Sequence, residues 1–244
     1  MDSEVLLIRG LFRGRYHWGN FPEELQQTLR GKKVVSFDIP GNGFLNFDRS
    51  PKSIEGMVES IRSQRLSKGK VSVVAISMGG MIGLKWAEMY PEEIETLICI
   101  NTTSKGASPF YQRLLPRNYF RLAVSLFSNP FKRELYIHQM VSNRSVNVNT
   151  VNKWACFSKL YPTKKCNFFR QLIAAQKYRA SKPRCQVFFI SSKKDNLVSY
   201  KATRELATLW GLPLIINHHD GHDIPLDNPV WLCEVLRSLI SVEV

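Results

Sequence analysis

One serine in the sequence stands where a nucleophile could be activated. Ser77 follows the apolar run Val71–Ile76 and precedes a helical pattern, with Ala75 and Gly79 two residues to either side. A nucleophile on a sharp strand-to-helix turn needs such small neighbours, because larger side chains would collide there. The N–H groups at the start of the helix would face a developing oxyanion. The pattern therefore indicates acyl transfer, although an ordinary glycine-containing turn fits the same residues.

A serine hydroxyl is a weak nucleophile and needs a base that is itself oriented by a carboxylate. Two later segments offer these groups. Asp195 lies in SSKKDNLV after the apolar run Gln186–Ile190, and HHDGHDIPLDNP after the last apolar run offers His218, His219 and His222. Loops at the carboxyl ends of parallel strands converge on one crevice, so a serine, an aspartate and a histidine can meet there.

The elements that would position these groups follow from the hydrophobic pattern. Short apolar runs alternate with helical patterns at both ends of the chain, which is typical of a mostly parallel sheet flanked by helices. We expect strands at residues 5–8, 34–37, 71–76, 96–100, 186–190 and 213–217. We expect helices at residues 54–65, 81–90, 200–209 and 229–240.

The middle of the chain breaks this alternation. Helical patterns at residues 119–127, 131–141, 148–160 and 167–178 dominate there, and β patterning is scarce. An insertion of about eighty residues is far longer than an ordinary connection between elements, which points to a functional role. We therefore predict a core formed by residues 1–104 and 186–244, with a helical cap at residues 105–185.

The excess positive charge is also located in this middle segment. Residues 105–185 contain sixteen lysines and arginines but a single acid, Glu134, in a chain whose net charge is +14. Such a segment repels itself and favours an anionic partner. Three partners suit it: an acyl carrier protein or coenzyme A thioester, an anionic membrane, or nucleic acid. Its many aromatic residues occur at helical spacing, which is more typical of a cap core than of ligand contacts.

The segments AISMGG, KKDNLV and DGHDIPLDNP, in this order, resemble the α/β-hydrolase superfamily. The resemblance covers both ends of the chain, and the insertion lies where that family carries its cap. It implies the α/β-hydrolase fold and a triad with Ser77 as nucleophile and Asp195 as orienting acid. The family's histidine follows a glycine and precedes a helix that starts with proline, which selects His222, with Pro229 beyond it. The implied activity is hydrolysis of a carboxylic ester, with no cofactor.

The resemblance also implies two backbone donors for an oxyanion hole. One is the N–H of Met78, which follows the nucleophile. The other comes from the loop after the first strand, where the family pattern His-Gly-x reads Arg9-Gly10-Leu11 and so indicates Leu11. Arg9 either brings a cation to this loop, which would suit an anionic acyl substrate, or is a solvated or salt-bridged structural residue. We favour the structural role.

The length and layout of the chain are similar to those of small cytoplasmic esterases that cleave the methyl ester of pimeloyl-acyl carrier protein in biotin biosynthesis. This similarity implies a carrier-bound acyl ester, with an acidic acyl carrier protein docked on the basic cap. The candidate substrate or carrier contacts are Arg9, Trp18, Arg113, Arg117 and Arg121. The alternatives are an acyl thioesterase, a broad carboxylesterase, or a weakly catalytic module whose cap binds nucleic acid or an anionic membrane.

The hydropathy and the cysteine content indicate where in the cell the protein acts and whether it binds a metal. No apolar stretch approaches the roughly 18 residues that a membrane span needs, and the first apolar run is too brief for a secretory signal. The five cysteines are scattered without CxxC spacing, which fits reduced thiols in the cytoplasm and disfavours a metal site. We therefore expect a cytoplasmic protein without metal or cofactor, and nucleic acid as a disfavoured partner.

Overall fold

A single parallel sheet organises the structure, a computed structural model that describes residues 4–67 and 69–240. The strand order is β2-β1-β3-β4-β5-β6, and every neighbouring pair is parallel. The strands are β1 (Glu4–Ile8), β2 (Lys33–Phe37), β3 (Val71–Ile76), β4 (Ile94–Ile100), β5 (Gln186–Ser192) and β6 (Leu214–Asn217). The predicted α/β fold with a parallel sheet is confirmed.

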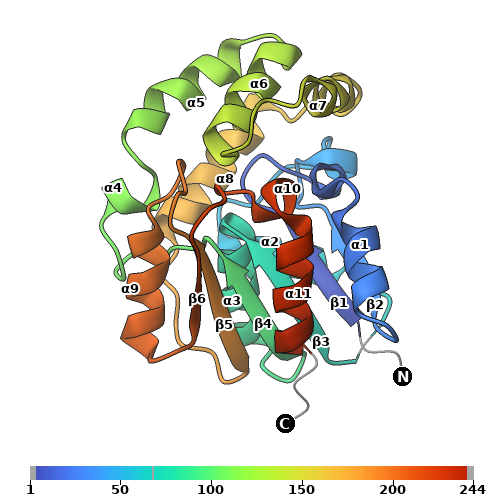
Figure 1. Cartoon of the computed structure of the whole chain (residues 1–244), viewed down its shortest axis with the longest axis vertical. Coiled ribbons are helices and arrows are strands. Elements are labelled where there is room, and N and C mark those ends of the chain that lie inside the picture. Colours follow the sequence, from blue (N-terminus) through green and yellow to red (C-terminus); the bar gives the residue numbers. More distant parts are fainter. Residues whose placement is uncertain (1–3, 68, 241–244) are drawn as a thin grey trace.

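Helices cover both faces of the sheet (Figure 1) because successive residues of each strand point to opposite sides. In β1, Leu6 and Ile8 pack toward one core and Val5 and Leu7 toward the other. The first core is completed by α2 (Ile54–Arg62), α3 (Met78–Met89) and α9 (Tyr200–Trp210). The second is completed by α1 (Phe21–Thr28) and α11 (Pro229–Ile240).

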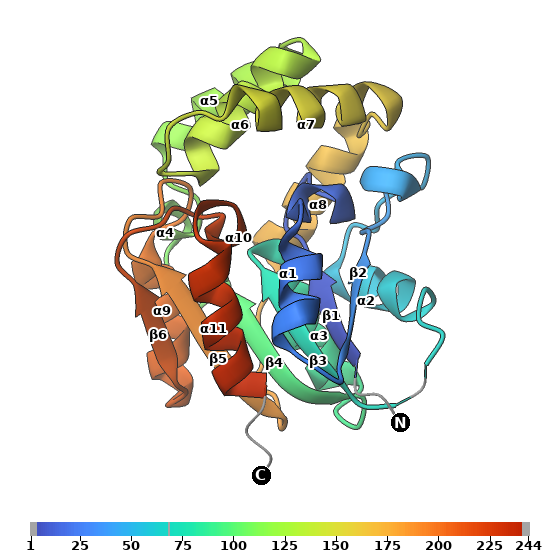
Figure 2. The same cartoon turned by 45° about the vertical axis from the view of Figure 1, so that its right-hand side comes forward.

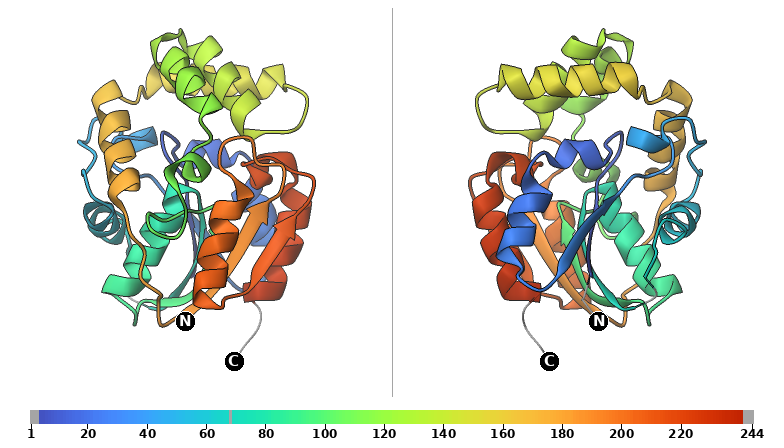
Figure 3. Two further views of the ribbon diagram at one scale, coloured as in Figure 1. Left: turned by 90° about the vertical axis from the view of Figure 1, so that its left-hand side faces the viewer. Right: turned by 90° about the vertical axis from the view of Figure 1, so that its right-hand side faces the viewer.

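Five further helices lie between β4 and β5 in the sequence, and we call them the cap helices. They are α4 (Phe110–Arg113), α5 (Arg117–Phe127), α6 (Pro130–Val141), α7 (Val148–Leu160) and α8 (Lys165–Lys177). Figures 2 and 3 show α5, α6 and α7 above the carboxyl ends of the strands, with α8 returning toward the sheet. Among residues 4–67 and 69–240, no helix is long and apolar enough to cross a membrane.

The structure contains helical turns that the hydrophobic pattern does not reveal. Helix α1, the single turn of α4 and the short α10 (Ile224–Asp227) are absent from the prediction, and α3 begins at Met78 instead of residue 81. Glycine disfavours helices, so MGG resembles a poor helix start. Close packing requires glycine here, because a Cβ atom on Gly79 would lie 2.4 Å from the carbonyl oxygen of Ile8.

A buried ion pair joins the end of β1 to the loop after β6. The Arg9 guanidinium donates to both carboxylate oxygens of Asp223, at 2.9 and 2.5 Å, and lies over the ring of Trp18. Both charged side chains are at least 96% buried. Burial alone would raise the pKa of Asp223, but the Arg9 guanidinium holds this pKa below its ordinary value. Of the two structural roles left open for Arg9, solvated or salt-bridged, the structure shows the salt bridge.

Replacing Arg9 with methionine will lower the free energy of unfolding by about 3–5 kcal/mol, because Asp223 is left as a buried charge without its partner. Urea denaturation at pH 7 measures this change. The matched control Arg121→Met removes an exposed cation and should change stability by less than about 0.5 kcal/mol. A decrease of less than about 1 kcal/mol in the free energy of unfolding of Arg9→Met would contradict the stabilising role of the Arg9–Asp223 ion pair.

The Arg9–Asp223 pair also makes the stability of the fold decrease at acidic pH. The folded pKa of Asp223 is depressed, so the pair contributes its full stability above the pKa of an unfolded aspartate, about 3.9. This contribution is lost as the pH falls through the lower folded value.

Candidate active site

The backbone of Ser77 adopts a conformation that few non-glycine residues take. Its φ and ψ are 58° and −121°, in the turn that joins β3 to α3. Such a backbone costs about 1–3 kcal/mol and persists only where the surroundings impose it. Here the Ser77 N–H donates to the carbonyl of Ile100 (2.8 Å), and the Thr102 hydroxyl donates to the Ser77 carbonyl (3.1 Å). The last residue of β4 and the loop that follows it therefore hold the serine turn in place.

The loop after β1 passes directly against this serine. A Cβ atom on Gly10 would lie 3.0 Å from the Ser77 Cβ and 3.4 Å from its Oγ, so a side chain at this position would crowd the hydroxyl. The Gln171 side chain of α8 holds the loop by accepting the Phe12 N–H at 3.1 Å. Leu11 and Met78, the predicted oxyanion donors, line the same cavity as Ser77. Their role as donors stays a prediction.

The predicted histidine and aspartate lie in hydrogen-bond contact. His222 Nδ1 is 2.6 Å from Asp195 Oδ2, and both side chains are buried. The other Asp195 oxygen accepts the backbone N–H groups of Leu197 and Val198, at 2.7 and 2.9 Å. These bonds fix the carboxylate, so the imidazole is held at one nitrogen and its Nε2 is left for other chemistry.

The loop that carries His222 is fixed by residues that the sequence analysis did not single out. The Asn101 amide donates to the carbonyl of His222 at 2.8 Å, and Asp227 accepts the Gly221 N–H at 2.7 Å. On the cap side, the carbonyl of Val141 accepts the Asp223 N–H at 2.8 Å. The sequence does contain a signal for Asn101, because it is a polar residue directly after a predicted strand. In the structure its φ is 50°.

Ser77 and His222 both open into one cavity of about 120 Å³ between the sheet and the cap helices. Its wall is mostly apolar and is built from both the core and the cap. The apolar lining includes Met78, Met81, Leu114, Leu122, Leu126, Ile137, Met140, Phe168 and Leu172. A cavity whose mostly apolar wall includes a serine and a histidine can receive a short acyl group.

The candidate binding arginines and Trp18 lie in different places. Trp18 is buried outside this cavity, where it supports the Arg9 guanidinium. Arg113 is also buried and lines the cavity, so it cannot meet a protein docked on the cap surface. Arg117 and Arg121 are exposed on α5, and Arg117 donates to the Asn196 side chain at 2.8 Å. Only these two remain candidates for a carrier contact.

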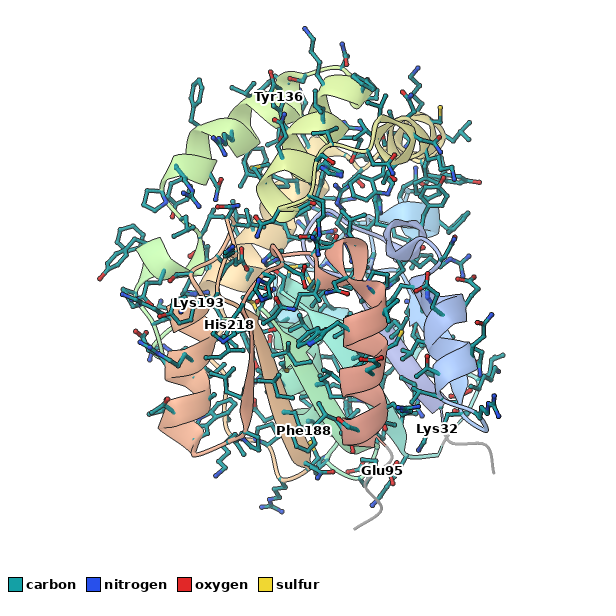
Figure 4. All side chains as sticks on the ribbon, in the orientation of Figure 1. Lys32, Glu95, Tyr136, Phe188, Lys193 and His218 are labelled. Carbon is teal, nitrogen blue, oxygen red and sulfur yellow. The ribbon has the colours of Figure 1, made fainter. Side chains whose placement is uncertain are left out.

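The other histidines near the end of the sheet lie outside the site. His218 and His219 are exposed in the loop after β6. Figure 4 shows His218 beside Lys193, whose N–H donates to the carbonyl of Asn217. Neither histidine lines the cavity that contains Ser77.

The cap aromatics divide into two groups. Trp154 and Phe168 are buried, as expected for a cap core, and Phe168 also lines the cavity. Phe120 and Phe127 are 77% and 76% exposed, which contradicts that expectation. They lie on the outer surface of α5, where helical spacing alone does not reveal which side is covered. Tyr136 lies on α6 near the top of the cap (Figure 4).

No metal is needed to explain the arrangement of these groups. Within the described ranges, no cluster of three or more histidine, cysteine, aspartate or glutamate side chains could hold a metal ion.

Comparison with known proteins identifies relatives over parts of the chain. It is 27% identical over 129 residues to a poly(3-hydroxyalkanoate) depolymerase of Ectopseudomonas oleovorans, covering 47% of this chain and 44% of that protein. It is 30% identical over 101 residues to the biotin biosynthesis bifunctional protein BioHC of Teredinibacter turnerae, covering 41% and 17%. The chain spans less than half the length of the first curated relatives that it matches.

Solved structures share the whole architecture at lower sequence identity. A hydrolase from Pseudomonas aeruginosa PA01 matches with a TM-score of 0.76 at 15% identity, covering 99% of this chain and 91% of that one. The sequence also matches the alpha/beta hydrolase fold family from residue 5 to residue 229. Because this match extends over almost the entire chain, the protein belongs to the alpha/beta hydrolase fold family.

Proposed function

We propose that the protein hydrolyses carboxylic esters through a covalent acyl-enzyme formed on Ser77. The observation that carries this proposal is the 2.6 Å contact between His222 Nδ1 and Asp195, with Ser77 and His222 on the wall of one apolar cavity. The matched depolymerase, whose name denotes cleavage of a polyester, supports an ester as the substrate class.

The groups divide the reaction into two halves. The Nδ1–H of His222 donates to the Asp195 carboxylate, which leaves Nε2 to accept the Ser77 proton as Oγ attacks the ester carbonyl. The N–H groups of Met78 and Leu11 stabilise the oxyanion, and protonated His222 gives its proton to the departing alcohol. His222 then takes a proton from water as the water oxygen attacks the acyl-enzyme, and it returns this proton to Ser77 Oγ as the acid leaves. The proposed reaction uses no cofactor.

A carrier-bound acyl ester is our proposal for the substrate, following the resemblance to pimeloyl-carrier esterases. The partial match to BioHC supports it, as does the exposed cationic surface of α5 that includes Arg117 and Arg121. The five cysteines are free thiols, which fits the cytoplasm as the proposed location. A thioesterase or a broad carboxylesterase would use the same site.

Replacing Ser77 with alanine will lower kcat for a short 4-nitrophenyl ester by at least about 10⁴-fold, because the acyl-enzyme cannot form. A fluorophosphonate probe should label the parent protein at Ser77, and mass spectrometry of the labelled peptide checks the position. The control Ser125→Ala removes another cavity serine, whose hydroxyl is already donated to the Leu122 carbonyl. This control should keep most of the activity. Full turnover in Ser77→Ala would rule out the proposed nucleophile.

Asp195→Asn will reduce kcat by about 10⁴-fold with little change in KM, because an amide N–H2 facing Nδ1 favours the wrong imidazole tautomer. The asparagine oxygen can still accept the Leu197 and Val198 N–H groups, so the loop should keep its shape. Steady-state kinetics together with a melting curve separates loss of catalysis from loss of folding. A folded variant that retains a tenth of the parent activity would exclude the orienting role.

Reversing charge at Arg117 and Arg121 together will raise KM for a carrier-bound ester by about tenfold or more, because both exposed cations would attract the acidic carrier. The same double variant should hydrolyse a free methyl ester at the parent rate. Lys52→Glu with Lys70→Glu makes an equal charge change at exposed sites outside the cap helices. Equal effects of the two double variants on the carrier-bound ester would count against docking on the cap.

A further inference from the structure

Arg113 is a buried cation on the wall of the cavity that contains Ser77. It is the last residue of α4 and is 92% buried. The surrounding wall is apolar and includes Leu114, Leu126 and Leu172. A charge in such surroundings is costly unless a partner satisfies it.

The protein supplies only neutral hydrogen-bond acceptors to this guanidinium, and one of its N–H groups has no acceptor. Arg113 donates to the carbonyls of Ala175 and Gln176 at the end of α8, at 2.6 and 3.3 Å. Its Nε–H is buried and has no hydrogen-bond partner among the residues that the structure describes. In the same ranges, no carboxylate lies within 4.0 Å of its nitrogens. Burial lowers the pKa of Arg113 from its ordinary value, although an arginine remains charged at neutral pH.

The other two arginines of the cavity wall each have the carboxylate partner that Arg113 lacks. Arg9 is neutralised by Asp223, and Arg13 donates to Glu134 at 2.6 Å. Both of those carboxylates are buried with their arginines. The protein thus provides an internal carboxylate for two of these three cations and none for the third.

We propose that Arg113 binds a carboxylate at the end of the substrate's acyl chain, away from the ester that Ser77 attacks. The preferred substrate is then a monoester of a dicarboxylic acid: its methylene groups contact the apolar wall, and its free carboxylate completes the guanidinium. This inference rests on the proposed ester hydrolysis alone, and it names a preferred substrate that differs from the carrier-bound ester proposed above. A chain bound to a carrier presents a neutral carbonyl at that point, which is a weaker acceptor for a cation.

The test compares three 4-nitrophenyl esters of equal chain length that end in a methyl group, a primary amide or a carboxylate. The parent protein should hydrolyse the carboxylate-ended ester with a kcat/KM about 10–100-fold above that of the methyl-ended ester, since a hydrogen bond to a charged group has this effect. A ratio below threefold would overturn the proposal. An amide-ended ester that is as good as the carboxylate would overturn the requirement for an anion.

Arg113→Met should remove this preference by raising KM for the carboxylate-ended ester, so that within this variant the kcat/KM values for the carboxylate-ended and methyl-ended esters become equal to within about threefold. Arg113→Lys keeps the charge and should retain some of the preference. Lys159→Met removes a cation from the cap surface and should leave the preference intact, which separates a specific contact from the general field of a basic protein. Equal losses on all three esters would show that Arg113 only caps α8.

A binding measurement separates this inference from the proposed reaction. A dicarboxylic acid such as glutarate or adipate should raise the melting temperature of Ser77→Ala, whereas the monocarboxylic acid of equal length should do so much less. The difference should vanish in Ser77→Ala with Arg113→Met. If the parent hydrolyses none of the esters but the melting difference is present, ester hydrolysis fails and the carboxylate site stands. If the esters are cleaved without preference and no melting difference appears, only the carboxylate site fails.

Discussion

The strained backbone of Ser77 is the constraint on which the site depends. A serine keeps a φ near 58° only where the surrounding segments of the chain impose this conformation. The glycines on three sides make this possible: Gly10 lets the loop after β1 approach, while Gly79 and Gly80 let α3 begin against β1 and Thr102. Of these three glycines, Gly10 is the one whose backbone lies against the Ser77 hydroxyl. The turn that would hold the nucleophile and the loop proposed to receive the oxyanion are therefore packed as one unit.

Buried charges and hydrogen bonds connect this unit to the rest of the molecule. The Arg9–Asp223 pair ties the β1 end to the residue after His222, and Asn101 ties the His222 carbonyl to the end of β4. Because Asp223 also donates its N–H to Val141, the histidine loop is connected to the cap as well. The position of the imidazole thus depends on the core and the cap together, and a change in either one is transmitted to it.

Much of the architecture could be predicted from the chain, because buried strands are recognisable as apolar runs. The strand Val71–Ile76 and the helices Val148–Leu160 and Pro229–Ile240 have the predicted bounds. Helix α1 could not be recognised, since it spans eight residues and its only buried side chains are Phe21 and Leu25.

The partners of the buried arginines could not be predicted from the hydrophobic pattern. Arg9 and Asp223 are 214 positions apart, and only the folded chain brings them together. Arg113 belongs to a segment so rich in basic residues that an exposed position was the natural expectation. Its burial depends on α8, whose final carbonyls lie more than sixty positions further along. The proposed triad and oxyanion donors remain predictions from motif order, which the geometry supports.

Glu134 is the single acid among the cap residues 105–185, and it is engaged with Arg13 in the loop that also contains Leu11. Any outward swing of α6 would pull these buried ions away from each other, which costs several kcal/mol unless water follows them into the gap. This buried ion pair therefore resists any separation of α6 from the loop that contains Leu11.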